Sequence, residues 1–371
     1  MDTIRVLQVV TELGMGGIQS FIMNVYRNID REKIQFDFLL NTDKKGVFED
    51  EIEKLGGRVF RVSSRNESFL KNKRELEEFF YKHREYRCVH CHFSNLSYLM
   101  PLKIAARAGI PTRIIHSHST HLPSNPLHKV LHEYNRRKLD SIATDFYACS
   151  DLAGKWLFGG TKGYEKQVIV NNGIQTEKYV YDEEVRKNIR VQLGVENKLV
   201  IANVGRLSEP KNHIFLLNVF AELKKNDLNT VLVLVGDGPE KERIENRIEE
   251  LGIGNSVMML GLRQDVPQLL QSFDCFLMPS KWEGFPVALI EAEAAGLPAY
   301  VSDKVTMQAK VNENVKYLSL DDGFEKWANQ ILDESQSWNR IKDVSTVVKA
   351  GYDIDSTVRF LEDKYISSYT V

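Results

Sequence analysis

The sequence has few cysteines, no long apolar segment and little net charge. Its four cysteines (Cys88, Cys91, Cys149 and Cys275) are scattered over 371 residues, which argues against a disulfide framework. No apolar run approaches the roughly 20 residues that a membrane-spanning helix needs. The chain leads from Met-Asp-Thr straight into a strand pattern, without the basic and apolar segments of a secretory leader. From these absences we expect a cytoplasmic protein.

The charged residues are distributed unevenly along the chain. The net charge is −2, so the composition gives no reason to expect a nucleic-acid partner. Residues 1–170 hold 26 Lys and Arg against 20 Asp and Glu, whereas the remainder holds 23 against 31. This asymmetry indicates two domains, of which the first meets something anionic. Ordinary solvated faces explain any single charged run equally well.

Short apolar runs alternate with amphipathic stretches along the whole chain, which indicates parallel βαβ units and doubly wound sheets. The expected strands of the first half are residues 4–10, 36–40, 58–62, 88–92, 112–118 and 145–150. After "VIVNNGI" (168–174), a second set is expected at residues 199–205, 230–236, 256–260, 274–278 and 298–301. Helical patterns lie between the strands, for example at 72–84.

The two sets of strands predict two Rossmann-like domains, residues 1–173 and 174–354. The polar stretch 175–188 is the expected hinge. A last helix, expected over 355–371, could return to the first domain or pack on the second. Ligands of such sheets bind at the carboxyl ends of the strands, so the polar residues that directly follow strands are the candidates for a site.

Two cations follow a strand in the second half. "NVGRLSEPKN" (203–212) places Arg206 and Lys211 at a strand exit that leads into a helix, an arrangement that suits a diphosphate. Solvated surface cations are the alternative. "VGDGPEKERIE" (235–245) adds a glycine turn at Gly236, where backbone N–H groups can meet an anion or a ribose.

A largely apolar helix that carries acids is predicted within "SKWEGFPVALIEAEAAGLP" (280–298). Glu283 lies in the preceding turn, and Pro286 fits the first helical position. Because an unpaired buried carboxylate costs several kcal/mol, Glu291 is expected to bind ligand hydroxyls or to pair with a neighbouring arginine. Glu293, about 200° further round the helix, is expected to be structural or linked to solvent.

These residues resemble a known family. Glu283 and Glu291 in "EGFPVALIE", with "GLP" after them and "GRLSEPKN" before them, resemble the retaining nucleotide-sugar glycosyltransferases of family 4. The N-terminal "GMGGIQ", "NNGI" and "VGDGP" also stand where that family has them, so the resemblance extends over the whole chain. It implies an α/β protein of the GT-B fold, in which two Rossmann-like domains face each other across a cleft.

The resemblance also implies residue roles. Arg206 and Lys211 would hold the donor diphosphate and offset charge on the departing nucleotide, and Glu291 would bind the ribose. The catalytic residues it implies are His118, Glu283, Arg206 and Lys211. The donor-binding residues it implies are Gly16, Gly17, Arg206, Lys211, Gly236, Leu262, Arg263, Glu283, Gly284, Phe285, Pro286, Val287 and Glu291. Among these, Leu262 and Arg263 would meet the nucleobase, and the backbone of Gly284 and Phe285 would meet the sugar.

A glycine loop, "TELGMGGIQSF" (11–21), connects the first strand to a helix. One interpretation is a dinucleotide fingerprint, but the third glycine is replaced by Gln19, and Asp37 lies inside the next strand rather than at its end. The resemblance instead places the loop, through Gly16 and Gly17, against the donor phosphates and the acceptor. The family often has an acid two positions after the glycine pair, where this chain has Gln19.

Histidines cluster at the ends of two expected strands. "VHCHFS" places His90 and His92 on one strand face, and "IIHSHSTH" does the same for His116 and His118. A zinc site is one interpretation, although the spacing matches no metal-binding signature; bonding to nearby backbone is another. The resemblance implies a functional histidine at His118, with His116 as the alternative. A neutral imidazole there would polarise a hydroxyl of the donor sugar and stabilise positive charge at the anomeric carbon.

The stretch "LHKVLHEYNRRKLDSIA" (127–143) predicts a basic amphipathic helix with Lys129, Arg136, Arg137 and Lys138. Such a helix can lie on an anionic membrane surface or dock on the sheet with its charges in water. Capsule and exopolysaccharide transferases of the family that this sequence resembles use lipid-diphosphate acceptors. Such acceptors fit a peripheral contact at the inner face of the plasma membrane.

The sequence therefore predicts a retaining glycosyltransferase for capsule or exopolysaccharide synthesis. Its donor is expected to be a UDP-hexose or UDP-N-acetylhexosamine, and its acceptor a lipid-linked or free oligosaccharide. No cofactor and no metal ion are expected, since Arg206 and Lys211 could take the role of a metal. A sugar-nucleotide epimerase, an NAD-dependent oxidoreductase and a non-catalytic sensor of nucleotide sugars are the alternatives. The sequence does not identify the sugar, the linkage or the oligomeric state.

Overall fold

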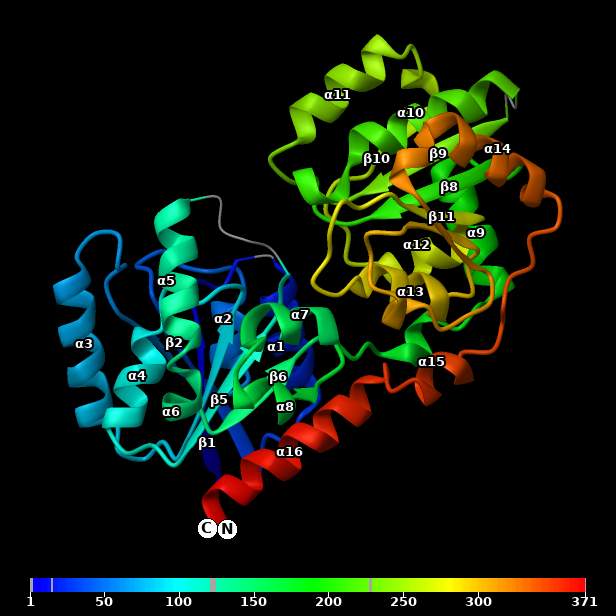
Figure 1. Cartoon of the computed structure of the whole chain (residues 1–371). Coiled ribbons are helices and arrows are strands. Elements are labelled where there is room, and N and C mark those ends of the chain that lie inside the picture. The colour runs from blue at the N-terminus through cyan, green and yellow to red at the C-terminus, as the bar shows by residue number, and fades with distance from the viewer. Residues whose placement is uncertain (1–2, 15, 121–124, 227–228, 371) are drawn as a thin grey trace. The chain divides into compact units, whose positions relative to one another are not determined.

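The computed structural model describes residues 3–14, 16–120, 125–226 and 229–370. The chain forms two compact units, one of residues 1–173 with 354–371 and one of residues 174–353 (Figure 1). Each unit has a parallel sheet with helices packed on it, so the expected α/β class with two Rossmann-like sheets is confirmed. No helix in the described ranges is long and apolar enough to cross a membrane.

The sheet of the first unit has seven strands in the order β3-β2-β1-β4-β5-β6-β7, and all of its neighbouring strands are parallel. Its strands are β1 (Ile4–Val10), β2 (Ile34–Leu40), β3 (Val59–Arg61), β4 (Cys88–Phe93), β5 (Thr112–Ser117), β6 (Asp145–Ala148) and β7 (Val168–Ile169). Its helices are α1 (Gly17–Asn28), α2 (Glu49–Lys54), α3 (Phe69–Lys82), α4 (Met100–Arg107), α5 (Pro126–Arg136), α6 (Leu139–Ile142), α7 (Asp151–Phe158), α8 (Lys162–Glu165) and α16 (Ile354–Thr370).

Both faces of this sheet are buried. Leu7 and Val9 of β1 belong to one apolar cluster, and the alternate residues Val6 and Val10 belong to another. Successive side chains of a strand point to opposite faces, which is why parallel strands covered on both sides are apolar throughout. The short continuous runs in the sequence are therefore explained by helices on both sides of the sheet.

Helix α16 packs on the first unit beside α1 (Figure 1). Its Val358, Leu361 and Tyr365 are buried in the cluster that contains Phe21 of α1. Near its end, Tyr369 donates a hydrogen bond to the carbonyl oxygen of Arg5. Of the two placements that the sequence left open for the last helix, the structure has the return to the first unit.

The sheet of the second unit has six parallel strands in the order β10-β9-β8-β11-β12-β13. They are β8 (Leu199–Val204), β9 (Thr230–Val235), β10 (Val257–Met259), β11 (Cys275–Met278), β12 (Ala299–Ser302) and β13 (Val315–Leu318). Its α-helices are α9 (Glu183–Leu193), α10 (His213–Asn226), α11 (Lys241–Glu250), α12 (Val266–Ser272), α13 (Val287–Ala294), α14 (Gly323–Ser335) and α15 (Ser345–Lys349). Its 3₁₀ helices are η1 (Thr176–Tyr179), η2 (Glu209–Lys211), η3 (Gly254–Ser256), η4 (Met307–Ala309) and η5 (Leu320–Asp322).

Two stretches differ from the expectations. The helix predicted over 127–143 is two helices, because a tight turn with Lys138 N bonded to Asn135 O separates α5 from α6. The stretch 175–188 contains η1 and the start of α9, which is capped by the Asp182 carboxylate through the N–H groups of Glu184 and Val185. A hinge role for this stretch stays a prediction.

Each sheet has one point where the strand order reverses, between β1 and β4 in the first unit and between β8 and β11 in the second. At such a point the loops leaving two neighbouring strands diverge to opposite faces and leave a crevice at the carboxyl edge. The loops that carry most of the candidate residues leave these four strands.

Candidate active site

In the second unit, Lys211 and Glu283 meet at the point where the strand order reverses. Lys211 ends η2 after β8, Glu283 lies in the loop after β11, and Lys211 Nζ is 2.7 Å from Glu283 Oε1. The hydroxyl of Ser280 donates a second hydrogen bond of 2.7 Å to the same oxygen. Both charged side chains are mostly buried, with 16% and 11% of their surfaces exposed, so the pair is much less screened than a surface ion pair.

Arg206 is exposed, and its guanidinium makes no hydrogen bond or ion pair within the described ranges. The two glycine turns beside it pack backbone against backbone. A Cβ atom at Gly236 would lie 2.0 Å from the carbonyl oxygen of Gly205, and one at Gly238 would lie 2.3 Å from that of Leu207. Any larger residue would therefore push these loops apart, which gives "VGDGP" a packing role besides its predicted place in the donor site.

Glu291 lies in α13 and has a partner that the sequence did not predict. The hydroxyl of Tyr179, in η1, donates a hydrogen bond of 2.8 Å to Glu291 Oε1. Burial raises the pKa of the Glu291 carboxyl to about 7, although the Tyr179 hydrogen bond and the charge of Lys211 lower it. A tyrosine thus takes the place of the neighbouring arginine considered from the sequence, and the carboxyl titrates near neutral pH.

The loop from Glu283 to Val287 leads into α13. The ring of Phe285 is buried and stacks on Tyr352, with centroids 5.3 Å apart. Pro286 was predicted to be the first helical residue. It is instead the residue before the helix, because its ψ of 76° is not helical and α13 begins at Val287. Gly284 lies between the acid and the anchored ring, and the loop is held at both ends.

The two residues predicted to meet the nucleobase follow β10. Leu262 is exposed, and Arg263 makes a two-pronged ion pair with Asp265 at 2.7 and 2.6 Å. Hydrogen bonding to Asp265 raises the pKa of Arg263. The guanidinium is thus held in one orientation, and an exposed apolar side chain lies beside it.

Glu293 is explained by the structure. It is buried in α13, and its carboxyl group accepts a hydrogen bond of 2.9 Å from Val311 N and another from Asn312 N. The Asn312 side chain donates in return to the carbonyl oxygen of Glu293 at 2.9 Å. This acid therefore fastens the helix to the 311–312 loop, which is the structural role considered from the sequence.

In the first unit, the glycine loop ends where α1 begins. Gly16 is the residue before the helix, and no side-chain hydrogen bond caps the first turn of α1. A Cβ atom at Gly17 would meet nothing within 4 Å. Gln19, at the position where the family often has an acid, donates a hydrogen bond of 2.8 Å to the carbonyl oxygen of Glu12. The amide of Gln19 thus lies against Gly16 at the start of the helix and stabilises the loop.

The four histidines lie together at the carboxyl ends of β4 and β5. His92 Nδ1 is 2.9 Å from His118 Nε2, and His90 Nε2 is 3.1 Å from His116 Nδ1. Among the residues that the structure describes, ring nitrogens of these histidines have side-chain partners. Burial lowers the pKa of His118 to about 3 and the pKa values of the other three well below their ordinary value. The cluster is therefore uncharged at neutral pH.

His90, His92 and His116 offer ring nitrogens that all lie within 4.8 Å of one another, close enough for a metal ion. Most of these nitrogens already have partners, because His90 Nδ1 is 2.7 Å from the Tyr365 hydroxyl and His92 Nε2 is 2.9 Å from Gln8 Oε1. A metal ion would have to replace such hydrogen bonds. The donor set therefore fits a hydrogen-bonded cluster better than a metal site.

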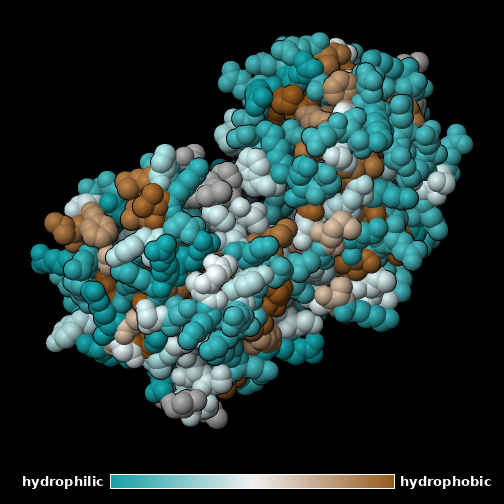
Figure 2. Space-filling model, in the orientation of Figure 1, coloured by the Kyte–Doolittle hydropathy of each residue, from teal (hydrophilic) through white to brown (hydrophobic). Residues whose placement is uncertain are grey.

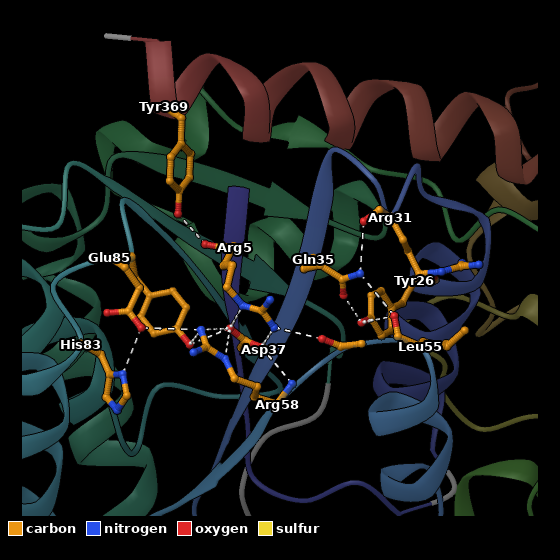
Figure 3. Close-up of polar contacts among 12 residues, drawn as sticks. Arg5, Tyr26, Arg31, Gln35, Asp37, Leu55, Arg58, His83, Glu85 and Tyr369 are labelled. Atoms are coloured by element: carbon orange, nitrogen blue, oxygen red, sulfur yellow. Dashed lines mark hydrogen bonds and ion pairs between the residues drawn. The ribbon is translucent and has the colours of Figure 1, made fainter. Parts of the chain in front are cut away.

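Asp37 does not lie where an acid would bind a dinucleotide ribose. It is fully buried within β2 and receives hydrogen bonds from Arg5 at 2.6 Å, Arg58 at 2.7 Å and the Tyr86 hydroxyl at 2.7 Å (Figure 3). Burial alone would raise the pKa of Asp37, but these hydrogen bonds outweigh it and hold the pKa below its ordinary value. The carboxylate is fully engaged in tying β1, β2 and β3 together, which removes a feature that NAD binding would need.

A cavity of about 260 Å³ lies in the first unit at the point where its strand order reverses. Residues at the carboxyl ends of β1, β2, β3 and β4 and in the loops after them line it, among them Thr11, Asn41, Arg65, His92, Asn95 and Tyr98. Arg65 is the single Lys, Arg, Asp or Glu among the lining residues that the structure describes. Its guanidinium is held by the carbonyl oxygen of Ser97 at 3.1 Å and lies over the Tyr98 ring. Hydroxyl and amide groups thus surround one fixed cation.

Some of the residues that bond to the candidate site residues could not be found from the sequence. Tyr179 lies in a stretch read as a connector, and Ser280 precedes the motif that drew attention to Glu283. Gln8 lies inside a strand that reads as continuously apolar. Its polarity within that run was the one available signal, since a buried polar side chain needs a partner.

Comparison with known proteins identifies the class. Residues 185–338 match the family model described as "Glycosyl transferases group 1". The chain is 33% identical to the putative glycosyltransferase EpsF of Bacillus subtilis (strain 168), over 97% of this chain and 96% of that protein. It is 28% identical to the UDP-Gal:alpha-D-GlcNAc-diphosphoundecaprenol alpha-1,3-galactosyltransferase of Escherichia coli, over 78% of this chain and 76% of that protein.

The fold agrees. The crystal structure of HepE from Anabaena in complex with UDP and glucose matches with a TM-score of 0.78 at 19% identity, covering 98% of this chain and all of that one. The chain therefore belongs to the group 1 glycosyltransferases and has the GT-B fold. It is a glycosyltransferase, as the resemblance implied.

Proposed function

We propose that this glycosyltransferase transfers a hexose or N-acetylhexosamine from UDP to a hydroxyl of a lipid-linked saccharide, in capsule or exopolysaccharide synthesis. The part of this proposal that concerns the donor rests on the Lys211–Glu283 pair, which lies at the ligand-binding edge of the second sheet. UDP as the nucleotide is supported by its presence in the HepE complex. A lipid diphosphate as the carrier is supported by the name of the Escherichia coli relative.

In this proposal, the second unit binds the donor. Lys211 has three N–H donors and uses one on Glu283, so the others can bind the diphosphate. Arg206 adds a second cation from the exposed side. Together they would stabilise the departing UDP by fixed charges, and no metal ion would be needed. Glu291 would accept hydrogen bonds from the ribose, and Glu283 from the sugar.

The anomeric configuration would be retained. Glu283 is held by Lys211 and Ser280, and it would act as a hydrogen-bond acceptor for the sugar rather than as a nucleophile. Departure of UDP and attack by the acceptor would then occur on one face of the sugar. His118, whose pKa is lowered to about 3, would contribute as a neutral imidazole that accepts a hydrogen bond from a sugar hydroxyl.

The acceptor would bind in the cavity of the first unit. Its hydroxyl and amide lining suits a saccharide, Tyr98 and Phe93 add ring faces for a pyranose, and His92 connects the cavity to His118. Arg65 would meet an anionic group of the acceptor. The phosphate nearest the first sugar of the lipid carrier and the carboxylate of a uronic acid share this chemistry, and acceptors carrying one or the other distinguish them.

A surface of the first unit would contact the membrane, and we call it the basic-apolar surface. Figure 2 shows apolar side chains gathered over α5 and α3. The exposed apolar residues of this surface are Phe69, Leu70, Leu127, Val130 and Tyr134. Its cations lie on α3, α4 and α5 and after α5, and they are Lys73, Lys103, Arg107, Lys129 and Lys138. Cations beside exposed apolar side chains suit an anionic bilayer.

The test is a thermal-shift panel with UDP, GDP, ADP, CMP and NAD, each with and without EDTA. A ligand at 100 times its dissociation constant stabilises the fold by about 2.7 kcal/mol. Stabilisation by UDP alone, unchanged by EDTA, supports the proposal and leads to a screen of UDP-sugars with an anomeric analysis of the product by NMR. Stabilisation by NAD, or a loss of stability in EDTA, contradicts it. Conversion of the UDP-sugar without any acceptor would indicate an epimerase, and binding without turnover a sensor.

A further inference from the structure

Gln8 is the buried end of a chain of side chains that leads to His118. Its Oε1 is 2.9 Å from His92 Nε2, and His92 Nδ1 is 2.9 Å from His118 Nε2. The chain crosses three neighbouring strands, because Gln8 lies on β1, His92 on β4 and His118 directly after β5. Gln8 and His92 are 1% and 7% exposed, so the hydrogen bond between them is largely shielded from water, whereas His118 is partly exposed.

Each imidazole in this chain is neutral at pH 7. Burial lowers the pKa of His92 well below its ordinary value and lowers that of His118 to about 3. A neutral imidazole has one N–H donor and one nitrogen lone pair. The bond between His92 Nδ1 and His118 Nε2 therefore needs one protonated and one unprotonated nitrogen, and the direction of this bond is set further along the chain.

Gln8 sets that direction. Its carbonyl oxygen Oε1 can only accept a hydrogen bond, so His92 carries its proton on Nε2. His92 Nδ1 is then unprotonated and must accept from His118 Nε2. We infer that Gln8, acting through His92, is a positioning residue that holds His118 in the tautomer with its proton on Nε2 and a lone pair on Nδ1.

This tautomer matters for the proposed function, on which the inference rests. A lone pair on His118 Nδ1 can accept a hydrogen bond from a hydroxyl of the donor sugar. That bond increases electron density on the hydroxyl oxygen and so stabilises positive charge that develops nearby at the anomeric carbon. With the opposite tautomer, His118 would donate to the same oxygen and withdraw density from it.

A second pair of histidines lies beside this chain and provides a comparison variant. His90 Nε2 is 3.1 Å from His116 Nδ1, and His90 Nδ1 is 2.7 Å from the Tyr365 hydroxyl. Tyr365 comes from α16 and is 1% exposed, and its hydroxyl also interacts with the Gln8 side chain. Removing its hydroxyl disturbs the neighbouring pair and one contact of Gln8, but it keeps Gln8 Oε1, His92 and His118 themselves.

The tautomer can be measured directly by ¹⁵N NMR on the full chain labelled at histidine, at pH 7. The His118 signals are identified by their absence in His118→Asn. We expect a protonated Nε2 and an unprotonated Nδ1 for His118. A proton on Nδ1, or an equal mixture of tautomers, overturns the inference. This measurement needs neither a donor nor an acceptor, so it stands apart from any failure of the proposed activity.

Gln8→Met keeps the length of the side chain and removes the accepting oxygen. We expect a mixture of His118 tautomers and a kcat lower by at least about tenfold, with the KM for the donor changed by less than about twofold. Tyr365→Phe removes a neighbour of Gln8 but keeps its accepting oxygen, so it should leave the His118 proton on Nε2. An unchanged tautomer in folded Gln8→Met contradicts the positioning role. If the wild-type tautomer is as inferred and His118→Asn transfers at the normal rate, positioning by Gln8 stands and the proposed role of His118 fails.

Discussion

At the scale of single residues, Lys211 and Glu283 neutralise each other in the free protein at a separation of 2.7 Å. Their low exposure makes the interaction stronger than that of a surface pair. An arriving diphosphate would bring negative charge to a site that already holds one carboxylate, so the cations must outnumber the acids there. Arg206 provides that excess, which is why we place it in the donor site although it has no protein partner in the described ranges.

Lys211→Ala should lower kcat by at least about tenfold, or roughly 1.4 kcal/mol of transition-state stabilisation, because it removes a charge that offsets the leaving diphosphate. The control is Lys281→Ala, which removes an exposed lysine from the neighbouring loop and should leave kcat unchanged. Melting temperatures of both variants separate lost catalysis from lost folding. Near-normal turnover by folded Lys211→Ala would remove this residue from the mechanism.

Glu291 should give the enzyme a dependence on pH near neutrality. Its pKa is raised to about 7, so the carboxyl is protonated below that pH and ionised above it. An ionised carboxylate accepts stronger hydrogen bonds from the ribose than a neutral acid does. We expect kcat/KM for the donor to rise between pH 6 and 8 in the wild type and to stay flat in Glu291→Gln.

Tyr179→Phe sharpens this test. The Tyr179 hydrogen bond lowers the pKa of Glu291, so its removal should move the rise in kcat/KM to higher pH without abolishing it. A rise that persists unchanged in Glu291→Gln would assign it to another group.

At the scale of elements, α13 carries two acids with different functions. Glu291 lies partly exposed near the carboxyl edge of the sheet, whereas Glu293 is turned into the core and bonds to the N–H groups of Val311 and Asn312. Burial raises the pKa of Glu293 to about 8. The folded protein therefore holds a proton on this residue at pH values where the unfolded chain has released it.

Glu293 should make the protein less stable as pH rises. Since its folded pKa is above its unfolded value, its contribution is fully present below about pH 4.5 and is lost as pH rises through about 8. Glu293→Gln cannot titrate, so its free energy of unfolding relative to the wild type should increase by about 1 kcal/mol or more from pH 5 to pH 8. Urea unfolding at both pH values measures this. Glu313→Gln, an exposed acid on the same loop, should show no such trend.

The elements that the sequence predicts well are those with simple periodicity. The strands before the candidate loops are apolar and short, so residues 4–10 and 274–278 were found as β1 and β11 to within a residue. β13, an edge strand with the sequence Val-Lys-Tyr-Leu, was not predicted. Tyr179 and Gln8 were missed because their partners are distant in the chain, and no local pattern encodes a contact between η1 and α13 or between β1 and β4.

At the scale of the whole molecule, the first part of the chain has a net positive charge and the rest a net negative charge. Residues 1–170 carry six more cations than anions, and part of this excess lies in a groove lined by Lys73, Lys103, Arg107 and Lys138. Burial, and after it the nearby charge of Lys138, lower the pKa of Lys103, as like charges close together disfavour one another. An anionic surface would relieve that repulsion.

The basic-apolar surface should bind anionic vesicles, and the affinity should depend on both of its parts. Leu127 and Val130 are 62% and 65% exposed on α5, so replacing both with serine removes apolar area that would enter the interface without disturbing the core. We expect at least about tenfold weaker binding to phosphatidylglycerol vesicles, measured by flotation, and weaker wild-type binding as salt rises. Val191→Ser, a change at an equally exposed valine of α9 in the second unit, is the control and should bind as the wild type does. Equal binding to neutral and anionic vesicles, or no effect of the double substitution, would show that the acceptor reaches the enzyme without this surface.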